Sequence, residues 1–146
     1  MAKKTQVNIA NARTAEQIHA LNQIEAEKIC PFCGTDYLKT EHKKPILAET
    51  EHWLATLNRW PYKGSKLHLL LIHKIHEVHL DQITSEAWQE LKTLTSQLLK
   101  QFKIPGATLL MRFGDFHYTG GTVAHLHVQL IAGDPDQSEP VIARVG

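Results

Sequence analysis

The chain has 146 residues, a length that favours one hydrophobic core and a single domain over residues 1–146. With 42% hydrophobic and 21% charged residues it has the composition of a globular protein. Its formal charge of +1 gives no reason to expect an extended nucleic-acid surface or an anionic membrane as a partner.

Apolar stretches are short throughout the sequence. The most apolar, LHLLLI at residues 67–72, cannot span a bilayer, and the first residues lack the apolar core of a signal peptide. We therefore expect a soluble, cytoplasmic protein without membrane contact. The unusual residues are ten histidines and only two cysteines, Cys30 and Cys33, which a reducing compartment would keep as thiols for a metal or redox chemistry.

The first half of the chain predicts one helix followed by strands. Thr14 and Gln17 fit a capping box for a helix over residues 15–29. Pro31 and Gly34 then predict a sharp turn that presents both cysteine sulfurs from one knuckle. The predicted strands are 46–50, 53–57 and 67–72, with a loop at 58–66.

The second half predicts a long helix and two more strands. Thr84 is the expected N-cap of a helix with apolar residues on one face up to Phe102. Strands at 107–113 and 122–132 follow, joined by the glycine-rich link GDFHYTGG, and an irregular tail ends the sequence. The order favours an α+β fold with an antiparallel sheet, although a parallel crossover around the long helix is compatible with the same pattern.

The last predicted strand carries a row of polar side chains. Because strand side chains alternate, His125, His127 and Gln129 share one face, while the residues between them form an apolar face. Such a row is more often a solvated face than a site, but the preceding TGGT favours a site. Adjacent glycines, ending in Gly121, let backbone N–H groups approach an anion, and Thr122 adds a hydroxyl.

A neutral histidine is a competent nucleophile toward phosphorus. His127, central in the row, is best placed for that role, and the amide of Gln129 can donate to an oxygen that gains charge. The backbone around Gly121 and Thr122 is expected to help hold that oxygen.

These residues resemble the histidine-triad (HIT) superfamily over residues 30–133, through CPFC, NRWPY, LLLIHKIH and above all GGTVAHLHVQL. The resemblance implies an α+β fold with a five-stranded antiparallel sheet and two main helices, and usually a homodimer. It implies cleavage or transfer at the α-phosphate of a nucleotide or dinucleoside polyphosphate through a nucleotidyl-histidine. The pattern H-x-H-x-Q looks like the branch of galactose-1-phosphate uridylyltransferase and diadenosine tetraphosphate phosphorylase.

Position by position, the resemblance makes His127 the nucleophile and Gln129 the phosphate-contacting third member of the triad. It places Thr122 at the phosphate, Asn58 at the ribose and Arg112 near the phosphate or ribose. His73 stands where many relatives have proline. Among the other residues, we expect His42 on the surface and His68 as a hydrogen-bonded residue of a buried strand.

Cys30 and Cys33 can supply two thiolates to a tetrahedral zinc. Several histidines could complete the site by composition, namely His73, His76, His79, His125 and His127. The resemblance selects His76 and His125, which predicts a structural zinc closed by four protein ligands. The alternatives are a turn without metal and a redox pair, and the latter is less favoured because the motif follows a helix.

Three functions are compatible with these residues. The main prediction is a nucleotide hydrolase or nucleotidyltransferase with His127 as nucleophile. The alternative is a non-catalytic nucleotide-binding, zinc-stabilised interaction module. A zinc hydrolase using metal-bound water would need an open coordination position.

Overall fold

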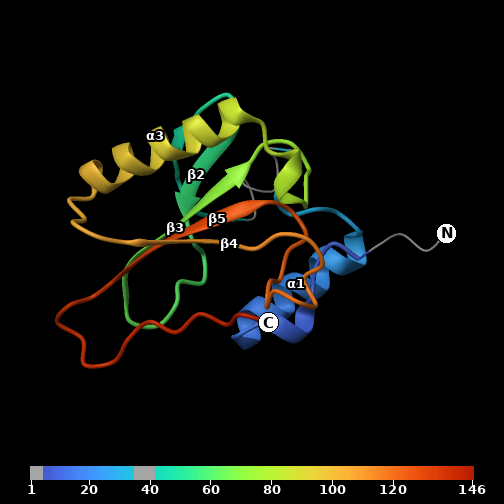
Figure 1. Cartoon of the computed structure of the whole chain (residues 1–146). Helices are drawn as coiled ribbons and strands as arrows, with labels where there is room; N and C mark the ends of the chain where they lie inside the picture. The colour runs from blue at the N-terminus through green and yellow to red at the C-terminus, as the bar shows by residue number, and fades with distance from the viewer. Residues whose placement is uncertain (1–4, 35–41) are drawn as a thin grey trace.

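The computed structural model describes residues 5–34 and 42–146, so part of the predicted domain span 1–146 lies outside the described residues. Within them, five strands form one antiparallel sheet in the order β1-β2-β3-β5-β4, accompanied by two α-helices (Figure 1). The strands are β1 Ile46–Glu49, β2 Trp53–Leu57, β3 Ser65–His73, β4 Thr108–Met111 and β5 His127–Gly133. The helices are α1 Ala15–Glu27 and α3 Ser85–Gln101, with short 3-10 turns at Ile9–Asn11 and Leu80–Gln82. The predicted α+β fold is confirmed.

Both helices begin at the residues that the sequence indicates. The hydroxyl of Thr14 accepts a hydrogen bond from the backbone N–H of Gln17 at 3.1 Å, and that of Thr84 accepts one from Ala87 at 3.2 Å. Helix α1 ends sooner than predicted, because Lys28 adopts the left-handed conformation, with φ 54°. No helix among the described residues is long and apolar enough to cross a membrane.

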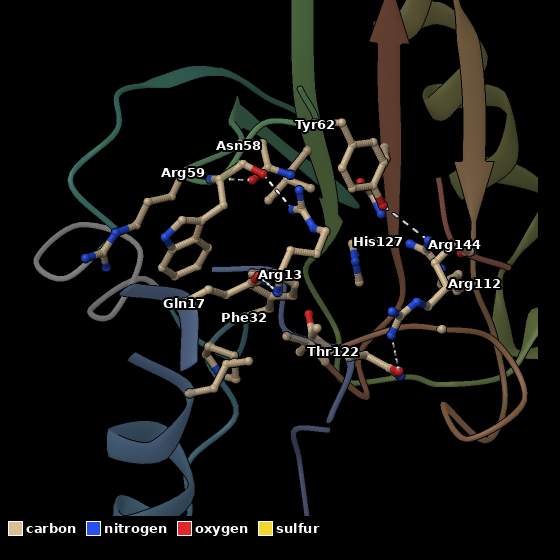
Figure 2. Close-up of a pocket in the computed structure, with 18 of the residues that line it drawn as sticks. Arg13, Gln17, Phe32, Asn58, Arg59, Tyr62, Arg112, Thr122, His127 and Arg144 are labelled. Atoms are coloured by element: carbon tan, nitrogen blue, oxygen red, sulfur yellow. Dashed lines mark hydrogen bonds between the residues drawn. The ribbon is translucent and has the colours of Figure 1, made fainter. Parts of the chain in front are cut away.

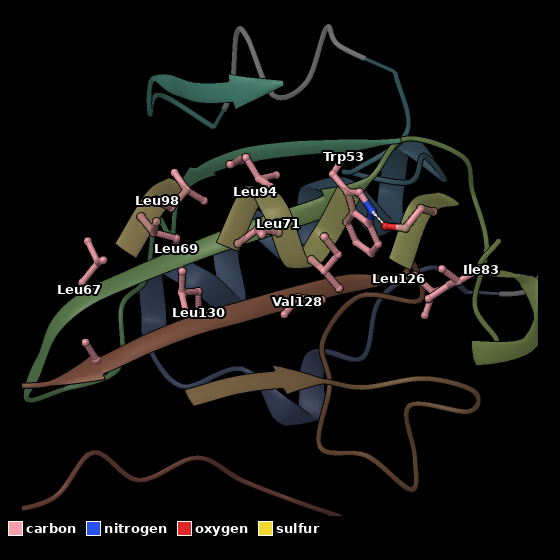
Figure 3. Packing of buried hydrophobic residues seen from close by; sticks show 14 residues of the cluster. Trp53, Leu67, Leu69, Leu71, Ile83, Leu94, Leu98, Leu126, Val128 and Leu130 are labelled. Atoms are coloured by element: carbon pink, nitrogen blue, oxygen red, sulfur yellow. Dashed lines mark hydrogen bonds between the residues drawn. The ribbon is translucent and has the colours of Figure 1, made fainter. Parts of the chain in front are cut away.

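Helix α3 covers one face of the sheet (Figure 3). Its buried leucines, such as Leu94 and Leu98, pack in one cluster with Leu69, Leu71 and Val128 of the central strands. Each such side chain contributes roughly 1.5–3 kcal/mol of burial free energy. The opposite face of the sheet, toward α1, is therefore the one left for polar side chains.

Strand β5 begins later than predicted. Residues 122–126 form no regular strand, because their backbone groups pair with other segments. Asn8 donates to the carbonyl of Thr122 at 2.9 Å, Ala124 donates to Gln6 at 2.9 Å, and Leu126 donates to Glu77 at 2.8 Å. The predicted start of the strand at 122 is therefore wrong: His125 lies before β5, although its ring and that of His127 both contact Phe32. The other four strands lie within two residues of their predicted bounds.

Candidate functional site

Strand β5 presents His127 and Gln129 on the sheet face opposite α3. In the pairing with β3, His127 lies opposite Ile72 and Gln129 opposite Leu70. Both polar side chains are buried, at 8% and 6% exposure, so the row is not a solvated face. Their burial makes the hydrogen-bond partners of each side chain decisive for its chemistry.

The imidazole of His127 has one nitrogen engaged and one available. Its Nδ1 lies 2.7 Å from the carbonyl oxygen of His125, a contact in which Nδ1–H donates. Burial lowers the pKa of His127 to about 4, which keeps the ring neutral near pH 7. With the proton on Nδ1, the lone pair is on Nε2, which forms no hydrogen bond within the described part of the chain. His127 thus has the tautomer that a nucleophile requires.

The orientation of Gln129 is set by His68 of β3, the buried hydrogen-bonded residue that the sequence predicts. The backbone N–H of Tyr62 donates to Nδ1 of His68 at 3.0 Å, so the proton of the neutral ring is on Nε2. That Nε2–H donates to Oε1 of Gln129 at 2.7 Å. Burial lowers the pKa of His68 to about 4, which preserves this arrangement near pH 7. The amide NH₂ of Gln129 is consequently left to donate elsewhere.

These two side chains line a cavity of about 240 Å³ between the sheet and α1 (Figure 2). One part of its lining is apolar and includes Leu21, Phe32 and Leu70. All four arginines of the sequence also line it, whereas no described lining residue is acidic. The cavity lining contains Arg13, Arg59, Arg112 and Arg144. A cavity whose lining combines an apolar part with several cations and no described acidic side chain suits an anion that carries an apolar or aromatic group.

Three of the predicted substrate-binding residues, Asn58, Arg112 and Thr122, line this cavity. The side-chain oxygen of Asn58 accepts a hydrogen bond from the backbone of Trp60 at 2.8 Å. Arg112 donates from Nε to the carbonyl of Thr119 at 2.8 Å. These bonds fix both side chains at the cavity before any ligand binds.

The glycine pair before the triad is arranged differently from the expectation. The N–H of Gly121 donates to the hydroxyl of Thr119 at 3.2 Å, and its carbonyl accepts from Asn11 at 2.8 Å. Gly120 and Thr122 line the cavity, whereas Gly121 does not. In this structure the N–H of Gly121 is therefore engaged within the loop instead of facing an anion.

Several cavity residues were not singled out from the sequence. Arg13 donates to the carbonyl of Trp60 at 2.6 Å and lies over the ring of Tyr62 at 4.3 Å. His42, expected on the surface, is 4% exposed, and its Nε2 lies 2.9 Å from the carbonyl of Leu57. That surface assignment was wrong because a lone histidine among lysines carries no periodic signal. The sequence did not predict that Arg144 lines the cavity either, because Arg144 lies in the irregular segment after the last strand.

Four side chains converge beside this cavity at the predicted metal site. The ligand atoms of Cys30, Cys33, His76 and His125 all lie within 4.8 Å of one another. Nδ1 of His76 and Nδ1 of His125 are 3.2 Å apart, and Sγ of Cys33 lies 3.1 Å from the first and 3.5 Å from the second. Tetrahedral zinc would separate N–N and N–S ligand pairs by roughly 3.3–3.6 Å.

The chemistry of these four groups also fits zinc. The Nε2–H of His125 donates to the carbonyl of His73 at 2.6 Å, so Nδ1 carries the lone pair that faces the cysteines. Burial raises the pKa of the Cys30 thiol to about 12, and a bound cation would offset this cost of the thiolate. Four protein ligands would fill a tetrahedral sphere, which suits structural zinc and leaves no position for metal-bound water.

Comparison with known proteins agrees with this fold. The family model described as "HIT domain" matches residues 39–136, more than half of the chain, so the protein belongs to the HIT family. A comparison with curated protein sequences found no match.

Solved structures share the fold at low sequence identity. A HIT family hydrolase from Clostridium thermocellum is 24% identical, with a TM-score of 0.58 over 77% of this chain and 96% of that one. A histidine triad nucleotide-binding protein from Candida albicans is 24% identical, with a TM-score of 0.58 over 80% and 86%. A Zn-bound histidine triad family protein from Mycobacterium smegmatis is 20% identical, with a TM-score of 0.53 over 75% and 78%.

Proposed function

We propose that the protein is a nucleotide hydrolase or nucleotidyltransferase that acts at the α-phosphate of a nucleotide or dinucleoside polyphosphate. The observation that carries this proposal is the neutral His127, held through Nδ1 with Nε2 available, in a cavity lined by four arginines. The apolar part of the cavity would receive the nucleoside, and Arg112 its α-phosphate. Membership of the HIT family and the hydrolase and nucleotide-binding protein among its structural neighbours support this function.

The reaction has two displacements at phosphorus. In the first, Nε2 of His127 forms a bond to the α-phosphorus while the phosphorus–oxygen bond to the leaving group breaks, and its electron pair leaves with that oxygen. In the second, water or phosphate attacks the phosphorus, the phosphorus–nitrogen bond breaks, and its electron pair returns to Nε2. When water attacks, it releases one proton to solvent. The amide of Gln129 donates to a non-bridging oxygen whose charge grows in both transition states.

Trapping of the covalent intermediate tests this proposal. A dinucleoside polyphosphate labelled at its α-phosphate is mixed with the protein and quenched within one turnover. Wild type should carry the label, His127→Ala should carry none, and His19→Ala should be labelled like wild type, because His19 is an exposed residue of α1. Equal labelling of wild type and His127→Ala would refute the assignment.

A nucleotide-binding module without turnover is the alternative to an enzyme. Such a module needs the arginines and the apolar lining, but it does not need a histidine held in the nucleophilic tautomer. Calorimetric affinity and turnover, measured with the same mononucleotides and dinucleotides, separate the two functions. Micromolar affinity with no turnover of any substrate would favour the module.

The cluster of Cys30, Cys33, His76 and His125 is proposed to bind one structural zinc ion. When bound, the ion would tie the turn after α1 to the segments around β3 and β5. Elemental analysis of the native protein should find one zinc per chain, and chelation should lower the melting temperature. Cys33→Ser should lose the metal, whereas His79→Ala, outside the cluster, should retain it. A native protein without zinc, with melting unchanged by chelator, would exclude the site.

Two further proposals concern assembly and location. Strand β4 is an edge of the sheet and exposes half of Leu109, which supports a homodimer formed along this edge. Both cysteines are free thiols, the form that a reducing cytoplasm maintains, which supports a cytoplasmic location.

A further inference from the structure

Arg144 is the one cavity arginine that comes from the segment after the last strand. This segment runs back below the sheet and ends beside α1 (Figure 1). The carbonyl of Arg144 accepts a hydrogen bond from Nη2 of Arg112 at 2.7 Å. The same Nη2 donates to the hydroxyl of Tyr62 at 3.2 Å. Arg112 thus joins the returning segment to the wall of the cavity.

Arg144 also packs closely against the loop that precedes the triad. A Cβ on Gly120 would lie 3.0 Å from both Cγ and the carbonyl oxygen of Arg144. Gly120 itself has φ +70°, a conformation that other residues rarely adopt. Position 120 therefore needs glycine for two reasons: its backbone has a positive φ, and a side chain would collide with Arg144. The segment is seated at the cavity by backbone contacts, independently of the guanidinium of Arg144.

That guanidinium has little to neutralise it. Its only hydrogen bond within the described residues is a long one, 3.4 Å from Nη1 to the side-chain oxygen of Asn11. Among the described residues, neither Arg144, Arg112 nor Arg13 forms an ion pair. Three cations without ion-pair partners among the described residues that gather at one cavity attract an anion with more than one charged group.

The arginines lie on two sides of the proposed nucleophile. In Figure 2, Arg112 and Arg144 are on one side of His127, whereas Arg13 and Arg59 are on the other, with the apolar ring of Phe32. The apolar side suits a nucleoside. The opposite side, with Arg112 and Arg144, is then the place for whatever is attached beyond the scissile phosphorus.

We propose that Arg144, presented by the segment after β5 beside Arg112, forms a subsite for an anionic leaving group such as a phosphate or a nucleoside phosphate. This inference rests on the proposed function and sharpens it, because it selects substrates with negative charge beyond the scissile bond. When the phosphorus–oxygen bond breaks, its electron pair increases the charge on the departing phosphate. The guanidinium of Arg144 donates to that phosphate and stabilises it.

Two substrates with the same nucleoside test the subsite. One is a dinucleoside tetraphosphate, whose leaving group is anionic, and the other is the p-nitrophenyl ester of the mononucleotide, whose leaving group contains no phosphate. Arg144→Gln should lower kcat/KM for the tetraphosphate about tenfold and leave kcat/KM for the ester within about twofold of wild type. Arg144→Lys, which keeps a point charge, should fall between the two. Lys92→Gln, an exposed charge change on α3, should alter neither substrate.

Binding of inorganic pyrophosphate separates failure of this inference from failure of the proposed function, because it requires no turnover. By calorimetry, Arg144→Gln should raise the Kd of pyrophosphate about tenfold relative to wild type and Lys92→Gln. If Arg144→Gln lowers kcat/KM equally for both substrates, Arg144 only shapes the cavity. If kcat/KM and the Kd of pyrophosphate are both unchanged, Arg144 does not contact the leaving group. Either outcome overturns the inference. Pyrophosphate binding that depends on Arg144, in a protein that turns over neither substrate, would retain the subsite and reject the enzyme.

Discussion

At the residue scale, the hydrogen-bond partner of Gln129, the third triad residue, decides which end of its amide faces the cavity. A glutamine amide can face the cavity with either its oxygen or its nitrogen, and only the nitrogen donates to a phosphate oxygen. The bonds from Tyr62 to His68 and from His68 to Gln129 leave the nitrogen for the cavity. Since an amide does not titrate, the donor is present at every pH at which His68 stays neutral. His68 therefore sets the orientation of the Gln129 amide, and we expect it to act as a positioning residue.

Removing His68 should impair turnover by removing the hydrogen bond that orients Gln129. His68→Ala leaves the buried Oε1 of Gln129 without its donor, a loss worth roughly 1–3 kcal/mol, so kcat/KM should fall roughly 10- to 100-fold. If His68 acts only through Gln129, the double variant His68→Ala/Gln129→Ala should be no slower than Gln129→Ala. Steady-state kinetics on the three variants, with melting curves to verify folding, measure this coupling. Fully additive losses would contradict it.

At the scale of elements, local signals predicted the fold well. The caps at Thr14 and Thr84 and the apolar periodicity of each segment depend on near neighbours, so the sequence contains them. Strand β5 was placed too early because Asn8 and Gln6, far away in the sequence, bind the backbone of residues 122–126. Alternation alone cannot reveal which segment supplies a partner.

The residues of the candidate site also fall into two groups, those that the local sequence predicts and those that only the fold brings together. His127 and Gln129 could be found because they lie on one strand, and the cysteine pair because its spacing is local. Arg13 and Arg144 could not, because only the folded chain brings them to the cavity. His73, at a position where many relatives have proline, donates its backbone N–H to the carbonyl of Leu126 at 3.1 Å, a bond that proline could not make.

One contact between elements, the ion pair of His52 and Glu90, should make the stability of the fold depend on pH. Nδ1 of His52, between β1 and β2, lies 2.9 Å from Oε1 of Glu90 on α3. Hydrogen bonds from Thr50 and then His52 lower the pKa of Glu90 to about 2, and the bond to Glu90 raises the pKa of His52. The lowered carboxyl pKa stabilises the fold above about pH 4.3, and the raised imidazole pKa stabilises it below about pH 6.5. Both contributions are complete between these values; the first is lost as pH falls toward about 2, and the second as pH rises through the raised pKa of His52.

Glu90→Gln should therefore destabilise the protein more at pH 5.5 than at pH 8.5. At the higher pH less of His52 is protonated, so the charge of Glu90 has a weaker cationic partner. Urea unfolding of wild type and variant at the two pH values measures the difference. Glu27→Gln, an exposed change at the end of α1, should show the same small effect at both. Equal destabilisation by Glu90→Gln at both pH values would contradict the ion pair.

At the scale of the whole molecule, a net charge near zero conceals an uneven distribution. Sixteen basic and fifteen acidic residues nearly cancel, yet every arginine lines one cavity and no described acidic residue does. Among the described residues, no lysine is found in the cavity lining. Arginine presents a planar fork that matches phosphate, whereas lysine provides a point charge. The side chains best suited to a phosphate are therefore gathered at this cavity.

The sheet has an exposed edge that should join two copies of the protein. Strand β4 pairs only with β5 among the described strands, and Leu109 on it is 50% exposed. Pairing of this edge with a second copy would satisfy its free backbone groups and cover Leu109. Leu109→Lys should shift the protein from dimer to monomer in sedimentation velocity. Leu80→Lys, a matched change at a leucine with 40% exposure outside the sheet, should remain dimeric. A monomeric wild type, or a dimer unaffected by Leu109→Lys, would show that this edge is not the interface.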